Sequence, residues 1–136
     1  MLTFHHLGVA SPDLAAEVDA LSSLGYSAVG TPFTDSVLGV RGLFLRGCGP
    51  QLEVLEQLPG STVLDGWLAR GVRIYHQAFL ADPLEPELQK LQARGARLLG
   101  RPTPAVAFEG RRVCFVMLRG SILTELVDAG PAFRPA

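Results

Sequence analysis

The sequence has little cysteine and almost no net charge, and each shortage excludes a class of protein. Two cysteines in 136 residues cannot build a disulfide framework, and the spacing of Cys48 and Cys114 fits no zinc motif. The formal net charge is −1 and Lys and Arg form no cluster, so a nucleic acid is not an expected partner. Any functional site must therefore be built from other residue types.

Long hydrophobic runs are also missing, which excludes a membrane protein of the helical kind. No apolar run approaches the roughly 20 residues that a membrane-spanning helix requires. The first residues lack the basic segment and apolar run of a secretory signal, so we expect a cytoplasmic protein without a membrane partner. Hydrophobic residues make up 48% of the chain and the mean hydropathy is +0.27, which is enough to bury a core.

What the sequence does contain is a repeat, with one copy in each half. Residues 4–10 and 51–55 form the first copy, and residues 74–79 and 123–127 form the second. Each copy places a histidine early and a glutamate late, which pairs His6 with Glu53 and His76 with Glu125. A duplicated unit of this kind can bring four metal-binding side chains to its centre.

The two copies also share a predicted order of elements, namely one strand, one helix and three strands. The expected strands are 2–10, 26–33, 37–46 and 50–58, then 72–81, 96–101, 106–118 and 122–129. Ser11 offers a cap for the first helix, and Asp82 begins the second. We therefore predict one domain, 1–136, made of repeats at about 1–58 and 72–130 that a short helix near 61–70 joins.

Both glutamates interrupt strands that are otherwise apolar. Strand alternation puts Glu53 on the opposite face from Leu52 and Val54. It likewise puts Glu125 on the opposite face from Leu126. A buried carboxylate requires a partner, because burying an unpaired charge is very costly. A divalent cation shared with the two histidines is one such partner, and an ion pair with Arg41 or Arg112 is the alternative.

Two histidines and two glutamates form a borderline-hard ligand set. His6, Glu53, His76 and Glu125 would suit Zn, Co, Mn, Ni or Fe as the divalent metal ion. Such an ion can polarise a carbonyl and stabilise an enolate while a nearby carboxylate moves the proton. Arg41 and Arg112 occupy equivalent places in the two copies. They could hold a substrate carboxylate or phosphate, or they could be ordinary charges at strand ends.

The motifs together resemble a known superfamily. The most specific pieces are HLGVASPDL at residues 6–14, QLEVLE at 51–56, YHQAF at 75–79 and TEL at 124–126. Their order and spacing are similar to those of the vicinal-oxygen-chelate, or glyoxalase-like, superfamily, and most closely to its methylmalonyl-CoA epimerases. The resemblance covers nearly the whole chain. It implies an α+β fold in which two βαβββ modules form a curled mixed sheet around a metal cleft, and it implies a homodimer.

The same resemblance implies a metal-dependent epimerase or lyase that enolises an acyl-CoA or a small dicarbonyl substrate. Glu125 and Glu53 would be the catalytic proton carriers as well as ligands. The stretch 39–44, where the epimerases usually carry an acidic residue, has no carboxylate here. Two other functions stay open: a small-molecule-binding protein of the resistance type, and a glyoxalase or thiol transferase. Resistance proteins typically line the cleft with aromatic residues, which make up only 7% of this chain.

Overall fold

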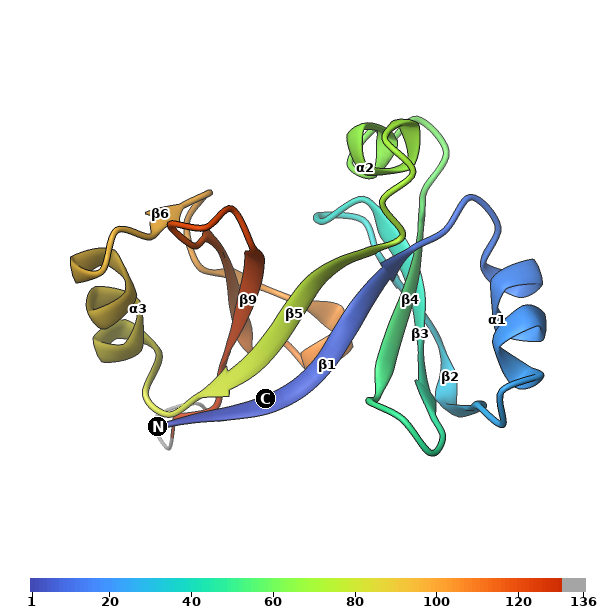
Figure 1. The fold of residues 1–136 in the computed structure, drawn as a ribbon, viewed down its shortest axis with the longest axis horizontal. Helices are drawn as coiled ribbons and strands as arrows, with labels where there is room; N and C mark the ends of the chain where they lie inside the picture. The colour runs from blue at the N-terminus through green and yellow to red at the C-terminus, as the bar shows by residue number, and fades with distance from the viewer. Residues whose placement is uncertain (131–136) are drawn as a thin grey trace. The chain divides into compact units, whose positions relative to one another are not determined.

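The computed structural model describes residues 1–130, which divide into two compact units (Figure 1). The N-terminal unit is His6–Tyr75, and the C-terminal unit joins Met1–His5 to the chain from His76 onward. The unit boundary falls inside strand β1 (Leu2–Ala10) and inside strand β5 (Ile74–Ala81). Within residues 1–130 every helix is too short or too polar to cross a membrane.

The N-terminal unit builds a four-stranded mixed sheet. After β1 come α1 (Leu14–Ser22), β2 (Ser27–Asp35), β3 (Val40–Arg46), β4 (Leu52–Gln57) and α2 (Asp65–Ala69). The strands follow the order β2-β3-β4-β1. Strand β1 runs parallel to β4, whereas β2, β3 and β4 pair antiparallel. Parallel strands cannot be joined by a tight hairpin, and α1 lies in the long connection that β1 and β4 need.

The C-terminal unit repeats this arrangement with a less regular middle. After β5 come α3 (Leu84–Ala93), β6 (Arg97–Leu98), β7 (Thr103–Pro104), η1 (Val106–Phe108), β8 (Arg112–Met117) and β9 (Leu123–Asp128). The order is β5-β9-β8-β6, and β7 also pairs with β8. Strand β5 is parallel to β9, the counterpart of β1 beside β4. Both sheets are mixed and helices are few, so the predicted α+β class is confirmed.

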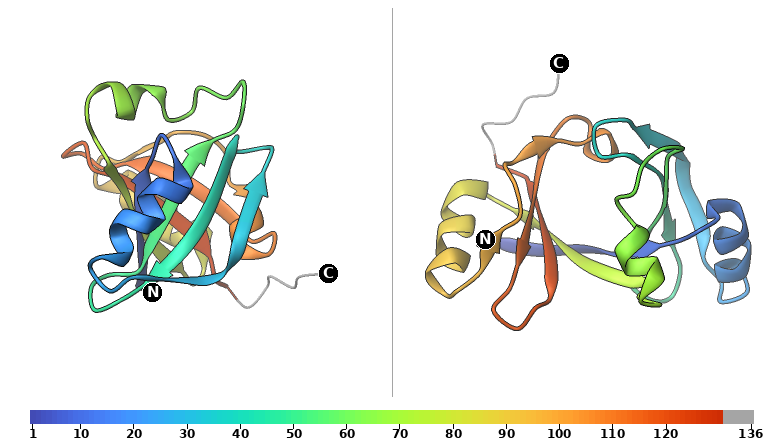
Figure 2. Two further views of the ribbon diagram at one scale, coloured as in Figure 1. Left: turned by 90° about the vertical axis from the view of Figure 1, so that its right-hand side faces the viewer. Right: turned by 90° about the horizontal axis from the view of Figure 1, so that it is seen from above.

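One helix covers one face of each sheet (Figure 2). Leu14 at the start of α1 packs with Leu52 and Val54 of β4, and Leu84 of α3 packs with Leu126 of β9. Burying a leucine side chain contributes about 2 kcal/mol, so these contacts fix which face of each strand lies under the helix. Because side chains alternate along a strand, the glutamates at 53 and 125 lie on the uncovered faces.

Both helices begin later than their sequences predict. Asp13, not Ser11, caps α1: its Oδ1 accepts a hydrogen bond of 3.1 Å from the backbone N–H of Ala16. The Ser11 hydroxyl instead accepts from the N–H of Asp13, which tightens the preceding turn. Helix α3 begins after Pro83, and no side chain caps it. Short polar side chains compete for the same donors, and only the backbone path decides which one reaches them.

The strand predicted at residues 106–118 is also shorter than expected. Residues 106–118 were predicted as one strand, but Val106–Phe108 form a 3-10 turn and β8 begins only at Arg112. Gly110 has φ of 84°, which a glycine adopts without strain, and its N–H bonds to the carbonyl of Ala105 at 3.0 Å. Local hydrogen bonds across this turn therefore override the β propensity of the valine and phenylalanine.

Candidate metal centre

In the N-terminal unit, a histidine and a glutamate on neighbouring strands lie side by side. Leu7 pairs with Leu52 and Gly8 with Glu53 in the parallel register of β1 and β4. This register brings Nε2 of His6 to 3.3 Å from Oε1 of Glu53. The two residues are only 0% and 4% exposed, so bulk water cannot solvate the carboxylate.

The C-terminal unit contains the same arrangement in the same register. Gln77 pairs with Thr124 and Ala78 with Glu125 in the parallel register of β5 and β9. Nε2 of His76 lies 3.5 Å from Oε1 of Glu125, and the two residues are 3% and 4% exposed. The structure thus brings each sequence-predicted histidine beside the glutamate of its own copy.

A phenylalanine stands edge-on to each histidine. The ring of Phe44 on β3 lies 5.5 Å from the ring of His6 with an interplanar angle of 74°. The ring of Phe115 on β8 lies 5.4 Å from that of His76 at 87°. In the sheet register Phe44 is opposite Glu53 and Phe115 is opposite Glu125. Each unit therefore presents a repeated trio of histidine, glutamate and phenylalanine.

Small residues complete the surroundings of both carboxylates. Gly8 is the β1 partner of Glu53 and Ala78 is the β5 partner of Glu125, and both small residues are buried. Side chains directly opposite each other in a sheet are close neighbours, so a large residue at position 8 or 78 would crowd the carboxylate.

The donor atoms fit a divalent metal ion. Two protein ligands bound to one ion at about 2.1 Å each lie about 3.0–3.4 Å apart when the angle between them is near 90–109°. The His–Glu distances of 3.3 and 3.5 Å are close to that spacing. Among the described residues, the buried His6, Glu53, His76 and Glu125 are those whose donor atoms could hold a metal ion.

Neither of the predicted substrate-binding arginines lies on the histidine face. Arg41 shares its face of β3 with Leu43 and Leu45, which pack under α1, and its Nη1 lies 3.5 Å from Oε1 of Glu56. Arg112 shares the α3 side of β8 with the buried Cys114. The role of Arg41 and Arg112 in substrate binding stays a prediction.

Arg112 is bound by two carboxylates. Its Nη2 lies 2.8 Å from Oδ2 of Asp128 and 2.6 Å from Oε1 of Glu85. The hydrogen bonds to Asp128 and then to Glu85 raise the pKa of the guanidinium above its usual value. The Arg112 guanidinium therefore stays charged at neutral pH.

Sequence reasoning missed the two phenylalanines as neighbours of the site. A signal was present, because Phe44 follows Arg41 and Phe115 follows Arg112 at the same spacing in the two copies. An aromatic residue in an apolar strand is usually part of a core, and the strand register was needed to place both rings beside histidines.

Comparisons with known proteins identify similar chains. An ethylmalonyl-CoA/methylmalonyl-CoA epimerase of Cereibacter sphaeroides is 28% identical over 115 residues, covering 82% of this chain and 85% of that protein. The crystal structure of methylmalonyl-CoA epimerase from Mycobacterium tuberculosis matches with a TM-score of 0.76 and 25% identity over 96% of this chain and 88% of that one.

A further solved structure shares the fold, and a family model matches the sequence itself. A hypothetical protein from Bacillus halodurans has a TM-score of 0.80 and 21% identity, covering 99% of this chain and 98% of that chain. The model of the Glyoxalase/Bleomycin resistance protein/Dioxygenase superfamily matches residues 5–115. With most of its length matched by that model, the chain belongs to the Glyoxalase/Bleomycin resistance protein/Dioxygenase superfamily.

Proposed function

We propose that this protein is a divalent-metal-dependent epimerase, or a related isomerase or lyase, that acts on an acyl thioester through an enolate. The observation that carries the proposal is the duplicated pair of donors, with His6 beside Glu53 and His76 beside Glu125 in one register. We further propose that the two pairs hold one ion together. The relative from Cereibacter sphaeroides supports a thioester of coenzyme A as the substrate.

The chain supplies binding and proton transfer in this proposal. A bound divalent ion would polarise the substrate carbonyl and stabilise the enolate. Epimerisation requires that a proton leaves one face of the reacting carbon and that another returns on the opposite face. We assign these two roles to Glu53 and Glu125, each of which holds or releases a proton at a carboxylate oxygen beside a histidine.

The composition of β3 supports the assignment to these two glutamates. Val40, Gly42 and Phe44 share the β3 face that is turned away from Leu43 and Leu45 under α1, so β3 offers no carboxylate there. The missing acidic residue of the third strand is therefore not replaced by a neighbour on the same strand. Both proton carriers must come from other elements, and Glu53 on β4 and Glu125 on β9 are buried carboxylates.

The test combines metal analysis with isotope exchange. The purified protein should bind a stoichiometric divalent ion, and the α-proton of methylmalonyl-CoA should exchange in deuterated water. Glu125→Gln keeps the shape of the side chain and removes its proton-carrying oxygen, so the exchange rate should fall by at least about a hundredfold. Asp19→Asn makes a similar change on an exposed position of α1 and should leave the rate unaltered.

Two results would contradict the proposal. One is a protein that binds no divalent ion and whose exchange is unaffected by His76→Ala. The other is tight binding of a small molecule with neither exchange nor turnover, which would favour a binding protein of the resistance type.

A further inference from the structure

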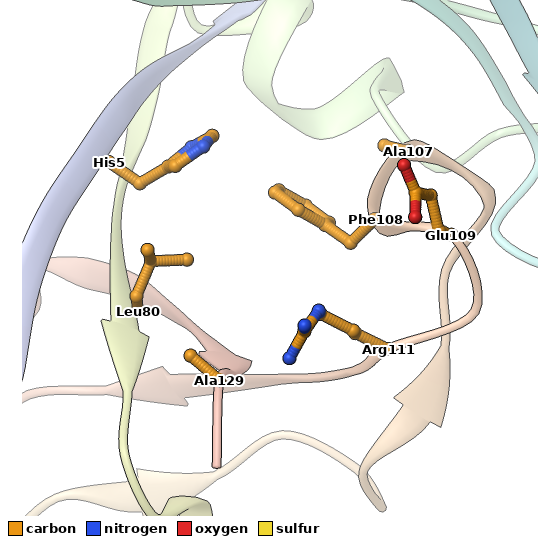
Figure 3. Close-up of a pocket in the computed structure, with 7 residues that line it drawn as sticks. All are labelled: His5, Leu80, Ala107, Phe108, Glu109, Arg111 and Ala129. Carbon is orange, nitrogen blue, oxygen red and sulfur yellow. The ribbon is translucent and has the colours of Figure 1, made fainter. Parts of the chain in front are cut away.

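A pocket of about 410 Å³ opens in the C-terminal unit, and neither His76 nor Glu125 is among its lining residues (Figure 3). Its volume lies in the range of small-molecule sites, which is about 300–1,000 Å³. The lining residues come from β1, from the end of β5, from the turn before β8 and from the end of β9. They are His5, Leu80, Ala107, Phe108, Glu109, Arg111 and Ala129.

Two of the lining residues lie on strand sides that carry candidate metal ligands. Leu80 lies on the same side of β5 as His76, and Ala129 follows the side of β9 that carries Glu125. From His76 to Leu80 the strand advances by about 13 Å, since each residue adds about 3.3 Å. The pocket and the reacting centre could therefore hold two parts of one long ligand.

The wall formed by residues 105–111 is held by its own backbone. Ala105 donates to the carbonyl of Arg111 at 3.1 Å and accepts from Gly110 at 3.0 Å, and Arg111 donates to Phe108 at 3.0 Å. Glu109 and Gly110 both have positive φ, at 55° and 84°, which closes the turn tightly. A wall held by such bonds loses little conformational entropy when a ligand binds.

Arg111 is the cation of this pocket. Its Nη1 donates to the backbone carbonyl of Asp128 at 3.2 Å, which holds the guanidinium in position. Figure 3 shows the guanidinium extending from the turn toward Leu80 and Ala129, and Glu109 lines the pocket from the same turn. Guanidinium groups recognise carboxylates and phosphates through pairs of charge-assisted hydrogen bonds.

The remaining lining is mixed, because Leu80, Ala107, Phe108 and Ala129 are apolar whereas His5 and Glu109 are polar. The ring of Phe108 lies 5.3 Å from that of His5 in an edge-on arrangement, and Leu80 faces the same space. The Phe108 ring and Leu80 beside the fixed Arg111 suit an oxyanion on a partly apolar stem, and the Glu109 carboxylate restricts where that oxyanion can lie. A free inorganic anion would leave these walls without a partner.

We propose that this pocket binds an oxyanion, phosphate or carboxylate, that the substrate carries far from its reacting carbon, and that Arg111 selects substrates for it. The proposal rests on the enolising function proposed above. In this proposal Arg111 binds the oxyanion and thereby selects the substrate. Phe108 and Leu80 contact the apolar stem of the ligand that leads to the oxyanion. A substrate with its only charge at the reacting centre would not use this pocket.

Two pairs of matched substrates distinguish a phosphate from a carboxylate as the oxyanion that the pocket binds. Methylmalonyl-CoA carries phosphates on its distal part, and methylmalonyl-pantetheine lacks them. The methylmalonyl thioesters of ω-mercaptooctanoate and ω-mercaptooctanol form a second pair, which differs only in a distal carboxylate. Exchange of the α-proton should show a lower KM for the charged member of one pair, with kcat similar within that pair.

Substitutions then test the residues. Arg111→Gln should raise KM for the preferred charged substrate by about ten- to hundredfold and leave its uncharged partner unaffected. Arg94→Gln removes the same charge from an exposed position at the end of α3 and should change neither KM. If Arg111→Gln does not fold, Ala107→Glu and Ala107→Lys alter the charge of the pocket wall and should weaken and strengthen binding respectively. An equal effect on charged and uncharged substrates would overturn the proposal.

Failure of the enolising function would be recognised separately. Calorimetry on the metal-free protein with coenzyme A, pantetheine, ω-mercaptooctanoate and ω-mercaptooctanol measures the pocket without any turnover. If no thioester exchanges but a charged ligand binds more tightly and Arg111→Gln abolishes the difference, the proposed function fails and the pocket stands. If neither charged ligand binds more tightly than its uncharged partner, the pocket proposal fails whatever the activity.

Discussion

At the scale of single residues, the molecule repeats a trio and not only a pair. The histidines and glutamates were predictable because they are polar residues at matched places in apolar strands. The phenylalanines were not, because apolar residues in strands carry no mark of what they touch. Only the register, which sets Phe44 opposite Glu53 and Phe115 opposite Glu125, assigns the rings to the site.

The Phe115 ring should orient His76. Replacing it with leucine removes the edge-on contact at 5.4 Å and frees the imidazole to rotate. Residues that orient metal ligands typically contribute about ten- to hundredfold to metal affinity, and we expect Phe115→Leu to weaken metal binding by about tenfold. A competition titration with a metal-sensitive dye would measure this change.

A matched control lies on the same unit. Phe79 on β5 packs with the α3 cluster on the opposite face, so Phe79→Leu should lower stability without changing the metal affinity. Equal metal affinities for the two variants would show that the ring of Phe115 serves only packing.

At the scale of elements, the order of strands and helices was predictable from alternation and turn residues, but their ends were not. Asp13 rather than Ser11 caps α1, and the expected strand 106–118 begins only at Arg112. These boundaries depend on local competition for backbone N–H groups. The candidate pocket lies at one of these mispredicted ends, where a tight turn replaces a strand.

Arg112 links two elements that the sequence does not connect. It joins Glu85 in the first turn of α3 to Asp128 at the end of β9. Arg112→Met should lower the free energy of unfolding by about 1 kcal/mol, a modest value because the side chain is partly exposed to water. Since its pKa is raised, the loss should be constant across neutral and alkaline pH and should shrink only at acidic pH, as the carboxylates become protonated.

Arg41, at the equivalent place in the other copy of the repeat, supplies a control for the Arg112→Met experiment. Arg41 is the equivalent residue of the N-terminal unit and makes a single longer contact of 3.5 Å with Glu56. Urea unfolding of Arg41→Met should therefore show a smaller loss than Arg112→Met. A larger loss at position 41 would refute the idea that Arg112 is a structural link.

At the scale of the whole molecule, each unit contributes one histidine and one glutamate to the candidate ligand set. A ligand that binds only the folded state stabilises it by about 2.7 kcal/mol at a free concentration a hundred times its Kd. Under the proposal of one shared ion, added metal should raise Tm by several degrees and a chelator should reverse the change.

Single histidine variants make this expectation specific. His6→Ala and His76→Ala should each abolish the rise in Tm, because either unit alone offers only half of the ligands. His5→Ala, which alters the neighbouring histidine outside the candidate set, should retain the rise. If only one of the two variants lost it, the ion would belong to a single unit.

The strand β1 is divided between the two units, and this division constrains the order in which the chain can fold during synthesis. The N-terminal unit, His6–Tyr75, is one continuous segment and can close as soon as it leaves the ribosome. The C-terminal unit requires Met1–His5 together with the chain from His76 onward, and Phe4 must wait for Phe79 before their rings meet at 5.6 Å. Although the two halves are copies in sequence, one is therefore complete well before the other, and the symmetry of the repeat does not extend to its assembly.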